Sequence, residues 1–200
     1  MKDSDRAEMI QAGLEEAERL NRLLANLLDM SRLEGGALKP TFESCDLEEV
    51  IGAALERVSK KVQGRKIRTT IPADFPLVPL DFVLVEQVLI NLLDNAAKYS
   101  PPASPLEIVV EIDEYVVTVS LSDQGSGIIE EDLERVFDKF YRACEHEKIA
   151  GTGLGLSICK GIIEAHGGSI WASNGSEGGA VITFTLPKTR PGRADGVHTI

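Results

Sequence analysis

The chain has 200 residues, 43% of them hydrophobic and 26% charged, which is enough for one folded domain with an additional segment. Its formal net charge of -11 argues against nucleic acid or an anionic membrane surface as the main partner, but a nucleotide is still allowed because local cations and a metal can meet its phosphates. The sequence has no run of about 18 apolar residues and its first residues are charged, so it predicts neither a membrane span nor a signal peptide.

The first predicted element is one long helix over residues 5–33. Apolar residues repeat every seven positions at Ile10, Ala17 and Leu24, and Leu20 and Leu27 fill a second seam. A glycine pair and a proline then end the pattern, at positions 35, 36 and 40. A stripe this broad favours packing in a bundle with other chains; the alternative is a helix that lies on its own domain.

A second helix is predicted over Asp46–Val62. Asp46 can act as its N-cap, with Glu49 as the reciprocal member of a capping box, and Gly64 is a plausible C-cap. The pattern then predicts a strand and a loop, at Ile67–Ile71 and Pro72–Pro79.

The central predicted helix, Phe82–Tyr99, begins after a capping Asp81 and ends before two prolines. Asn91 and Asn95 are four residues apart and therefore share one face, with Lys98 close to the same face. Amide oxygens beside a cation suit a hydrated divalent ion and the phosphates that it carries. The alternative is an ordinary polar helix face in water.

The remaining elements alternate irregularly between strands and helices. The sequence first predicts a hairpin of two strands, Leu106–Ile112 and Tyr115–Leu121, and then a short helix, Glu130–Phe137. A loop over 143–150 and a longer helix, Leu154–His166, come next. The last predicted element is a second hairpin, Ser169–Ala172 with Ala180–Leu186. Few apolar residues follow Pro187, so we expect a disordered tail. Strands mixed with three helices, without a regular alternation, predict an α+β two-layer sandwich.

Two glycine-rich stretches frame the second half of the chain. Asp123–Ile128 follows an apolar strand, Gly151–Leu156 precedes a helix, and Phe137–Arg142 lies between them. Together with the Asn91–Ser100 stretch, and in this order, they resemble the N, first glycine, F and second glycine boxes of sensor histidine kinases. The resemblance covers roughly residues 5–187. Within that family the chain is most similar to the Kdp potassium-responsive branch, on the runs Val88–Leu93, Ile158–Lys160 and His166–Gly168.

The resemblance implies a domain organisation. Residues 39–188 would form the Bergerat-type ATP-binding fold, with a mixed sheet and three helices. Residues 1–38 would be the second helix of a dimerisation and phosphoacceptor hairpin, whose first helix lies upstream, and 189–200 a tail. The implied activity is transfer of the ATP γ-phosphoryl group to a histidine outside this chain and then to a response regulator. The full protein would be a homodimer and the cytosolic part of a membrane-bound sensor.

The resemblance also assigns roles on the central helix and the strand tip. Asn95 would bind Mg²⁺ through its amide oxygen, supported by Asn91, while Lys98 would contact a phosphate and Tyr99 would form a wall of the nucleotide site. Asp123 ends a strand, and its carboxylate can accept from the exocyclic amine of adenine and would reject guanine. The alternative role for Asp123 is to cap the turn that follows it.

The glycine-rich stretches would hold the nucleotide. Gly125 and Gly127, with Ile128, allow a close backbone approach beneath it. The second stretch opens a helix, where free N–H groups and the helix dipole favour phosphate; its residues are Gly151, Thr152, Gly153, Leu154, Gly155 and Leu156. Lys139 and Arg142 could reach the γ-phosphate, and Phe137 and Phe140 would pack at the base of the 143–150 loop.

The histidines and cysteines carry no predicted chemistry. His146 precedes a glutamate, as phosphoacceptors do, but it lies in a polar loop without a downstream proline, and we do not expect it to be phosphorylated. His166 matches a structural position at a helix end. Cys45, Cys144 and Cys159 lack metal-ligand spacing and fit reduced thiols in the cytoplasm.

Two other functions fit the same fold. An ATPase or clamp relative would need a water-orienting carboxylate one turn before the metal-binding Asn, where this chain has the amide of Asn91. A nucleotide-sensing dimerisation module without kinase activity is the other alternative, because the acceptor histidine is absent.

Overall fold

The computed structural model describes residues 38–142 and 152–190 without a break, and in the N-terminal region residues 9–10, 13, 16–17, 20, 23–24, 26–28, 30–33 and 35. The chain divides into two compact units, Met1–Leu38 and Lys39–Ile200. In the first unit, the described residues from 9 to 33 are helical. Several of its apolar side chains are exposed: Met9, Ile10, Leu20, Leu24, Leu27 and Leu28.

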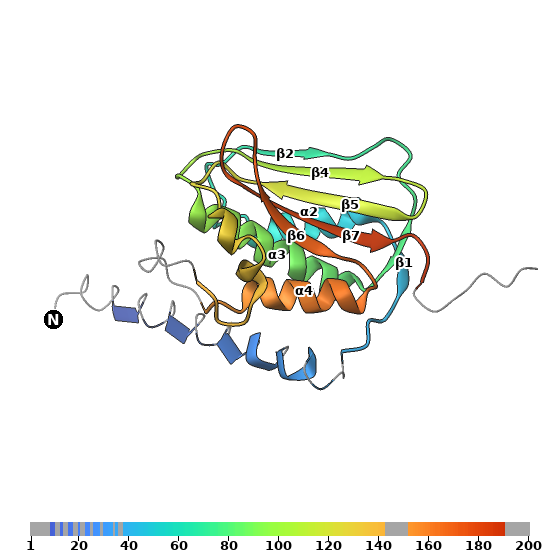
Figure 1. Cartoon of the computed structure of the whole chain (residues 1–200), viewed down its shortest axis with the longest axis horizontal. Helices are drawn as coiled ribbons and strands as arrows, with labels where there is room; N and C mark the ends of the chain where they lie inside the picture. Colours follow the sequence, from blue (N-terminus) through green and yellow to red (C-terminus); the bar gives the residue numbers. More distant parts are fainter. Residues whose placement is uncertain are drawn as a thin grey trace, which may run out of the picture. The chain divides into compact units, whose positions relative to one another are not determined.

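The second unit is built on a five-stranded sheet of order β2-β4-β5-β7-β6. The strands are β2 Ile67–Thr70, β4 Leu106–Ile112, β5 Val116–Ser122, β7 Ala180–Pro187 and β6 Ile170–Asn174. Only the β2–β4 pair is parallel among these, so the sheet is mixed. Three helices lie on one side of it in Figure 1, namely α2 Leu47–Val58, α3 Phe82–Tyr99 and α4 Gly155–Ala165. This confirms the predicted α+β sandwich with three helices.

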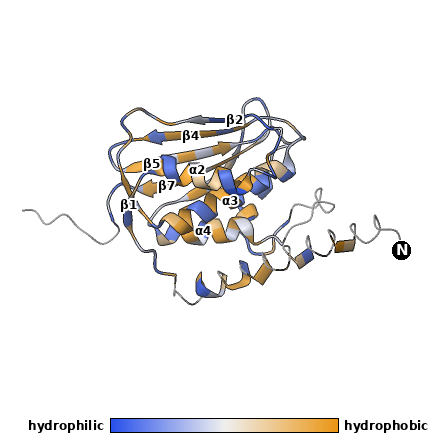
Figure 2. Ribbon diagram, turned by 180° about the vertical axis from the view of Figure 1, so that it is seen from behind, coloured by the Kyte–Doolittle hydropathy of each residue, from blue (hydrophilic) through white to orange (hydrophobic). Residues whose placement is uncertain are grey.

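The core lies between the sheet and the helices. Alternate residues of β4 and β5 are buried, as expected for strands with one covered face, and α3 buries an apolar stripe against them. Figure 2 shows apolar residues along α4, β5 and β7. The described part of the chain has no helix that is both long and apolar enough to cross a membrane.

Side-chain caps fix where two helices begin. Asp46 accepts from the Glu48 backbone N–H at the start of α2, and Asp81 accepts from that of Leu84 at the start of α3. His166 has the predicted structural role: its buried ring accepts from the Asp81 N–H at 3.1 Å and lies 2.8 Å from the Ile162 carbonyl. Burial lowers the pKa of His166, in keeping with a neutral ring.

Two predicted helices differ from the prediction by more than their end residues. Helix α2 ends at Val58, because a tight turn follows and folds the apolar Val62 into the core without continuing the helix. Gly64, with φ +81°, therefore lies in this turn and is not the C-cap. The predicted helix over Glu130–Phe137 is two short 3₁₀ turns, η1 Glu130–Asp132 and η2 Arg135–Phe137.

A small second sheet was not expected. β3 Val78–Leu80 overlaps the end of the stretch predicted as a loop, Pro72–Pro79, and pairs antiparallel with β1 Glu43–Cys45. The prolines of that stretch suggested a loop, but a two-stranded sheet tolerates proline because each strand has one hydrogen-bonded edge only.

Candidate functional site

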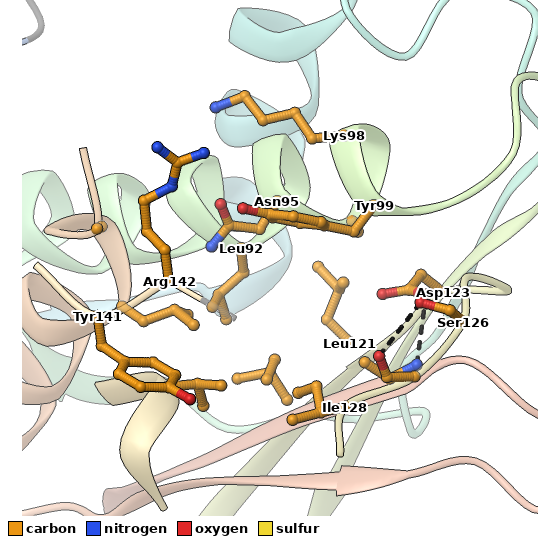
Figure 3. A pocket seen from close by; sticks show the side chains of 18 of the residues that line it. Leu92, Asn95, Lys98, Tyr99, Leu121, Asp123, Ser126, Ile128, Tyr141 and Arg142 are labelled. Atoms are coloured by element: carbon orange, nitrogen blue, oxygen red, sulfur yellow. Dashed lines mark hydrogen bonds between the residues drawn. The ribbon is translucent and has the colours of Figure 1, made fainter. Parts of the chain in front are cut away.

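A cavity of about 280 Å³ lies where the last turns of α3, the tip of β5 and the start of α4 come together. Figure 3 shows Asn95 and Tyr99 on α3 along one side of it, with Asp123 at one end and Tyr141 and Arg142 at the other. The lining is therefore mixed, with apolar side chains beneath amide, carboxylate, phenol and cationic groups. It comprises Leu92, Asn95, Ala96, Lys98, Tyr99, Leu121, Asp123, Ser126, Gly127, Ile128, Ile129, Val136, Tyr141, Arg142, Gly153, Gly155, Leu156, Ala180 and Ile182.

Lys98 lines the cavity, but its amine is held on the outer side of α3. It forms an ion pair with Asp94 one turn earlier, and Asp94 also accepts from Lys61. Burial alone would raise the pKa of Asp94, but the hydrogen bonds from Lys61 and Lys98 outweigh it and lower that pKa. In Figure 3 the Lys98 amine points away from the cavity, so contact with a ligand requires this side chain to turn.

Asn91 lies one turn before Asn95 and does not line the cavity. Its Nδ2 is buried and meets no hydrogen-bond partner at normal geometry within the described part of the chain, although the amide is close enough to the buried Cys159 thiol to lower the pKa of that thiol against the larger effect of burial. A methyl group added to Gly155 would lie 4.0 Å from the Asn91 Cγ, so this amide faces the beginning of α4. A buried amide N–H group without a partner at normal geometry is suited, at such a place, to a ligand or to the water around one.

Asp123 caps its own turn and also lines the cavity. One carboxylate oxygen accepts from the Gly125 N–H at 2.7 Å and from the Ala180 N–H at 3.3 Å. Burial raises the pKa of Asp123, although those two N–H groups and the charge of Arg65 act in the opposite direction. Both roles predicted for Asp123 are therefore structurally compatible.

Three glycines occupy positions where a side chain would collide with backbone or with a fixed polar group. A Cβ at Gly125 would lie 2.3 Å from the Tyr99 carbonyl oxygen. At Gly127, with φ +76°, it would lie 2.7 Å from the Asn174 Oδ1, and at Gly153, with φ +69°, 2.7 Å from the Phe140 carbonyl carbon. The loops therefore pack directly on their neighbours, as close backbone approach requires.

The far wall is built by the segment between the glycine stretches. Tyr141 donates to Asp132, and the Arg135 guanidinium lies 4.5 Å from the Tyr141 ring centre. Phe137 is buried, whereas Phe140 is 65% exposed, and the 143–150 loop whose base both were predicted to pack lies outside the described residues. The backbone of Phe140 contacts the second glycine stretch, because its N–H donates to the Gly153 carbonyl.

The predicted site residues divide into three groups. Ten line the cavity: Asn95, Lys98, Tyr99, Asp123, Gly127, Ile128, Arg142, Gly153, Gly155 and Leu156. Five are described but do not line it: Asn91, Gly125, Lys139, Thr152 and Leu154. Thr152 accepts from the Leu154 N–H at 3.2 Å, and the Leu154 side chain is buried in the core. Gly151 and the whole 143–150 loop, His146 included, lie outside the described residues.

Sequence reasoning missed Tyr141 and the apolar floor of the cavity. Leu92, Leu121 and Ile182 show the periodicity of ordinary core residues, so nothing in their spacing marks them as lining a cavity. Tyr141 could have been noticed, because it is the residue before Arg142 in the segment already singled out.

Comparison with known proteins gives consistent results. Residues 81–190 match the family model described as histidine kinase-, DNA gyrase B-, and HSP90-like ATPase. The chain is 43% identical over 185 residues to the sensor protein KdpD of Clostridium acetobutylicum, covering 90% of this chain and 20% of that protein. It thus spans about a fifth of the length of the first curated relatives that it matches.

Solved structures agree with this result. The mycobacterial sensor histidine kinase MprB is 31% identical with a TM-score of 0.67, covering 75% of this chain and 99% of that one. Histidine kinase ThkA, in complex with response regulator protein TrrA, is 27% identical with a TM-score of 0.74, covering 94% of this chain and 53% of that one.

Proposed function

The chain belongs to the histidine kinase-, DNA gyrase B- and HSP90-like ATPase family, as an ATP-binding catalytic domain of the sensor histidine kinase type, and from this we propose that it binds ATP with Mg²⁺ and presents the γ-phosphoryl group to a histidine outside this chain. The observation that carries the proposal is the convergence of Asn95, Tyr99 and Asp123 on one cavity. These three supply a metal ligand, an aromatic wall and an acceptor for the adenine amine.

The residues that would hold the metal fit Mg²⁺. This ion keeps several waters and takes few protein ligands, so the Asn95 amide oxygen with phosphate oxygens makes a sufficient set. Asn91 lies one turn away on the same helix, and its buried Nδ2 has no hydrogen-bond partner at normal geometry among the described residues. Bound Mg²⁺ would offset the phosphate charge that the chain's own cations do not neutralise.

The other residues would orient the nucleotide. Gly127, Ile128, Gly153, Gly155 and Leu156 line the cavity, and the start of α4 offers backbone N–H groups to phosphate. Lys98, Lys139 and Arg142 are the cations that would meet the γ-phosphoryl group. An imidazole nitrogen of the acceptor attacks the phosphorus, the bond to the β-phosphate oxygen breaks, and ADP leaves, so catalysis rests on positioning and charge.

We assign the rest of the system from the relatives. Residues 1–38 would be the second helix of a dimerisation hairpin, and the exposed apolar side chains along it suit a homodimer interface. Residues 39–188 would be the catalytic domain and 189–200 a tail. A response regulator would receive the phosphoryl group, and the whole protein would be a Kdp-type membrane-bound sensor with this part in the cytosol.

The test is a titration of the chain with ATP and GTP in the presence of Mg²⁺. We expect ATP to bind and GTP to bind at least tenfold more weakly, with ATP binding lost in Asn95→Ala and Asp123→Ala. Asp113→Ala is the matched control, because Asp113 also caps a turn, through the N–H groups of Tyr115 and Val116, but lies in the β4–β5 turn. Equal affinity for both nucleotides, or an equal effect of the two aspartate variants, contradicts the proposal.

A further inference from the structure

Both terminal nitrogens of the Arg65 guanidinium donate to the end of α3 and the loop that follows it. Arg65 precedes β2, and its Nη2 donates to the Ala97 carbonyl at 2.7 Å and to the Ser100 carbonyl at 3.2 Å. Its Nη1 donates to the Ser100 Oγ at 2.8 Å, the Ser104 Oγ at 3.0 Å and the Ser104 carbonyl at 3.3 Å. The Ala97 and Ser100 carbonyls belong to the last turn of α3 and the residue after it, where backbone acceptors have no partner inside the helix.

That helix end carries the proposed nucleotide-binding side chains. Asn95, Lys98 and Tyr99 all belong to the last turns of α3 and line the cavity. The Tyr99 carbonyl is packed so closely on Gly125 that a methyl group there would lie 2.3 Å from its oxygen. Gly125 in turn donates to Asp123. A continuous set of contacts therefore joins Arg65 to both sides of the cavity.

Arg65 also acts through its charge. A cation at the C-terminus of a helix is favourable because the helix dipole is negative there. Burial raises the pKa of Asp123; the backbone N–H groups of Gly125 and Ala180 act in the opposite direction, and the charge of Arg65 adds a smaller lowering effect. Two other cationic residues, Lys98 and Arg142, line the same cavity. The Lys98 amine forms an ion pair with Asp94.

We propose that Arg65 is a positioning residue of the nucleotide site, which fixes the end of α3 by its hydrogen bonds to the last backbone carbonyls of that helix. The proposal rests on the proposed ATP site. Arg65 would touch no part of the nucleotide, since it does not line the cavity. Its hydrogen bonds and its charge can be separated, because lysine keeps the charge without the planar fork of donors, whereas glutamine loses the charge.

The experiment measures ATP affinity as a function of pH for the unmodified chain, Arg65→Lys and Arg65→Gln, with the melting temperature of each. Arg68→Gln is the matched control, because it removes the same charge from an exposed residue three positions away on β2. We expect Arg65→Gln to weaken ATP binding roughly tenfold at neutral pH, Arg65→Lys to weaken it less, and Arg68→Gln to leave it unchanged.

The pH profile distinguishes positioning from plain stabilisation. Without the Arg65 charge the Asp123 pKa rises further, so the loss of ATP affinity on acidification should begin at higher pH in Arg65→Gln than in Arg65→Lys. The titration of ATP itself is common to all variants. The proposal is overturned if both Arg65 variants bind ATP as tightly as the unmodified chain does. It is also overturned if both bind ATP equally weakly, with one shared pH profile and equally lowered melting temperatures. If the unmodified chain binds no ATP, the proposed function fails instead. Should Arg65→Gln not fold, Arg65→Lys against Arg68→Gln decides the outcome.

Discussion

At the scale of single residues, we expect position 91 to separate phosphoryl transfer from hydrolysis. Hydrolysis needs a group that orients or deprotonates the attacking water, and an amide can hold a water but cannot take its proton. The nearest carboxylate on α3, Asp94, is already engaged by Lys61 and Lys98 and does not line the cavity. The site is therefore suited to holding ATP until an acceptor histidine arrives.

We predict a very slow intrinsic ATPase for the unmodified chain and a faster one for Asn91→Glu. The measurement is steady-state ADP release, with ATP affinity determined alongside because an added carboxylate can repel the phosphates. Asn91→Gln is the control, since it lengthens the side chain without adding a base. Rapid hydrolysis by the unmodified chain that disappears in Asp94→Asn would favour the ATPase alternative.

At the scale of elements, the first glycine loop depends on direct backbone packing against α3. Gly125→Ala places a methyl group 2.3 Å from the Tyr99 carbonyl oxygen, so either the loop or the helix end must shift. We predict that this variant folds but loses ATP affinity by at least tenfold, because Asp123 moves with the loop. Isothermal titration with ATP measures the effect.

The control for that variant is Gly52→Ala, in the exposed middle of α2, where an added methyl group meets nothing within 4 Å. It should bind ATP normally and stabilise the chain by up to ~1 kcal/mol, because alanine is the better helix former. Normal ATP binding by Gly125→Ala would show that the loop tolerates displacement.

Elements with a strong local signal could be predicted, and those set by tertiary contacts could not. The cap at Asp81, the period of α3 and the alternation in β4 are local, and α3 and β4 match their predicted bounds. The end of α2 could not be predicted from the sequence, because Val62 continues the apolar spacing of the helix although it reaches the core through a turn. β1 and β3 are three residues each, and they depend on a partner far away in the sequence.

At the scale of the whole molecule, sequence reasoning found the polar residues that line the cavity but not the ordinary core residues that line the rest of it. Asn95, Tyr99 and Asp123 stand out because polar groups interrupt apolar patterns, and the fold brings them together. Ile182 on β7 lines the same cavity, yet its sequence context is that of any buried strand residue. Arg65 gave no signal at all, because a single arginine before a strand is common and its five acceptors come from 32 to 39 residues further on.

This part of the protein should not phosphorylate itself. The chain matches the catalytic part of its relatives, and no described residue offers an acceptor: His166 is buried with both ring nitrogens engaged. We therefore expect no acid-labile, base-stable phosphohistidine from the chain with radiolabelled ATP. A supplied helical hairpin that carries an acceptor histidine should become labelled, and replacing that histidine by glutamine is the control. Stable label on His146 of the chain alone would contradict the role assigned to that loop. A hairpin that stays unlabelled while ATP is bound would favour the nucleotide-sensing alternative, because binding without transfer is what separates that class from a kinase.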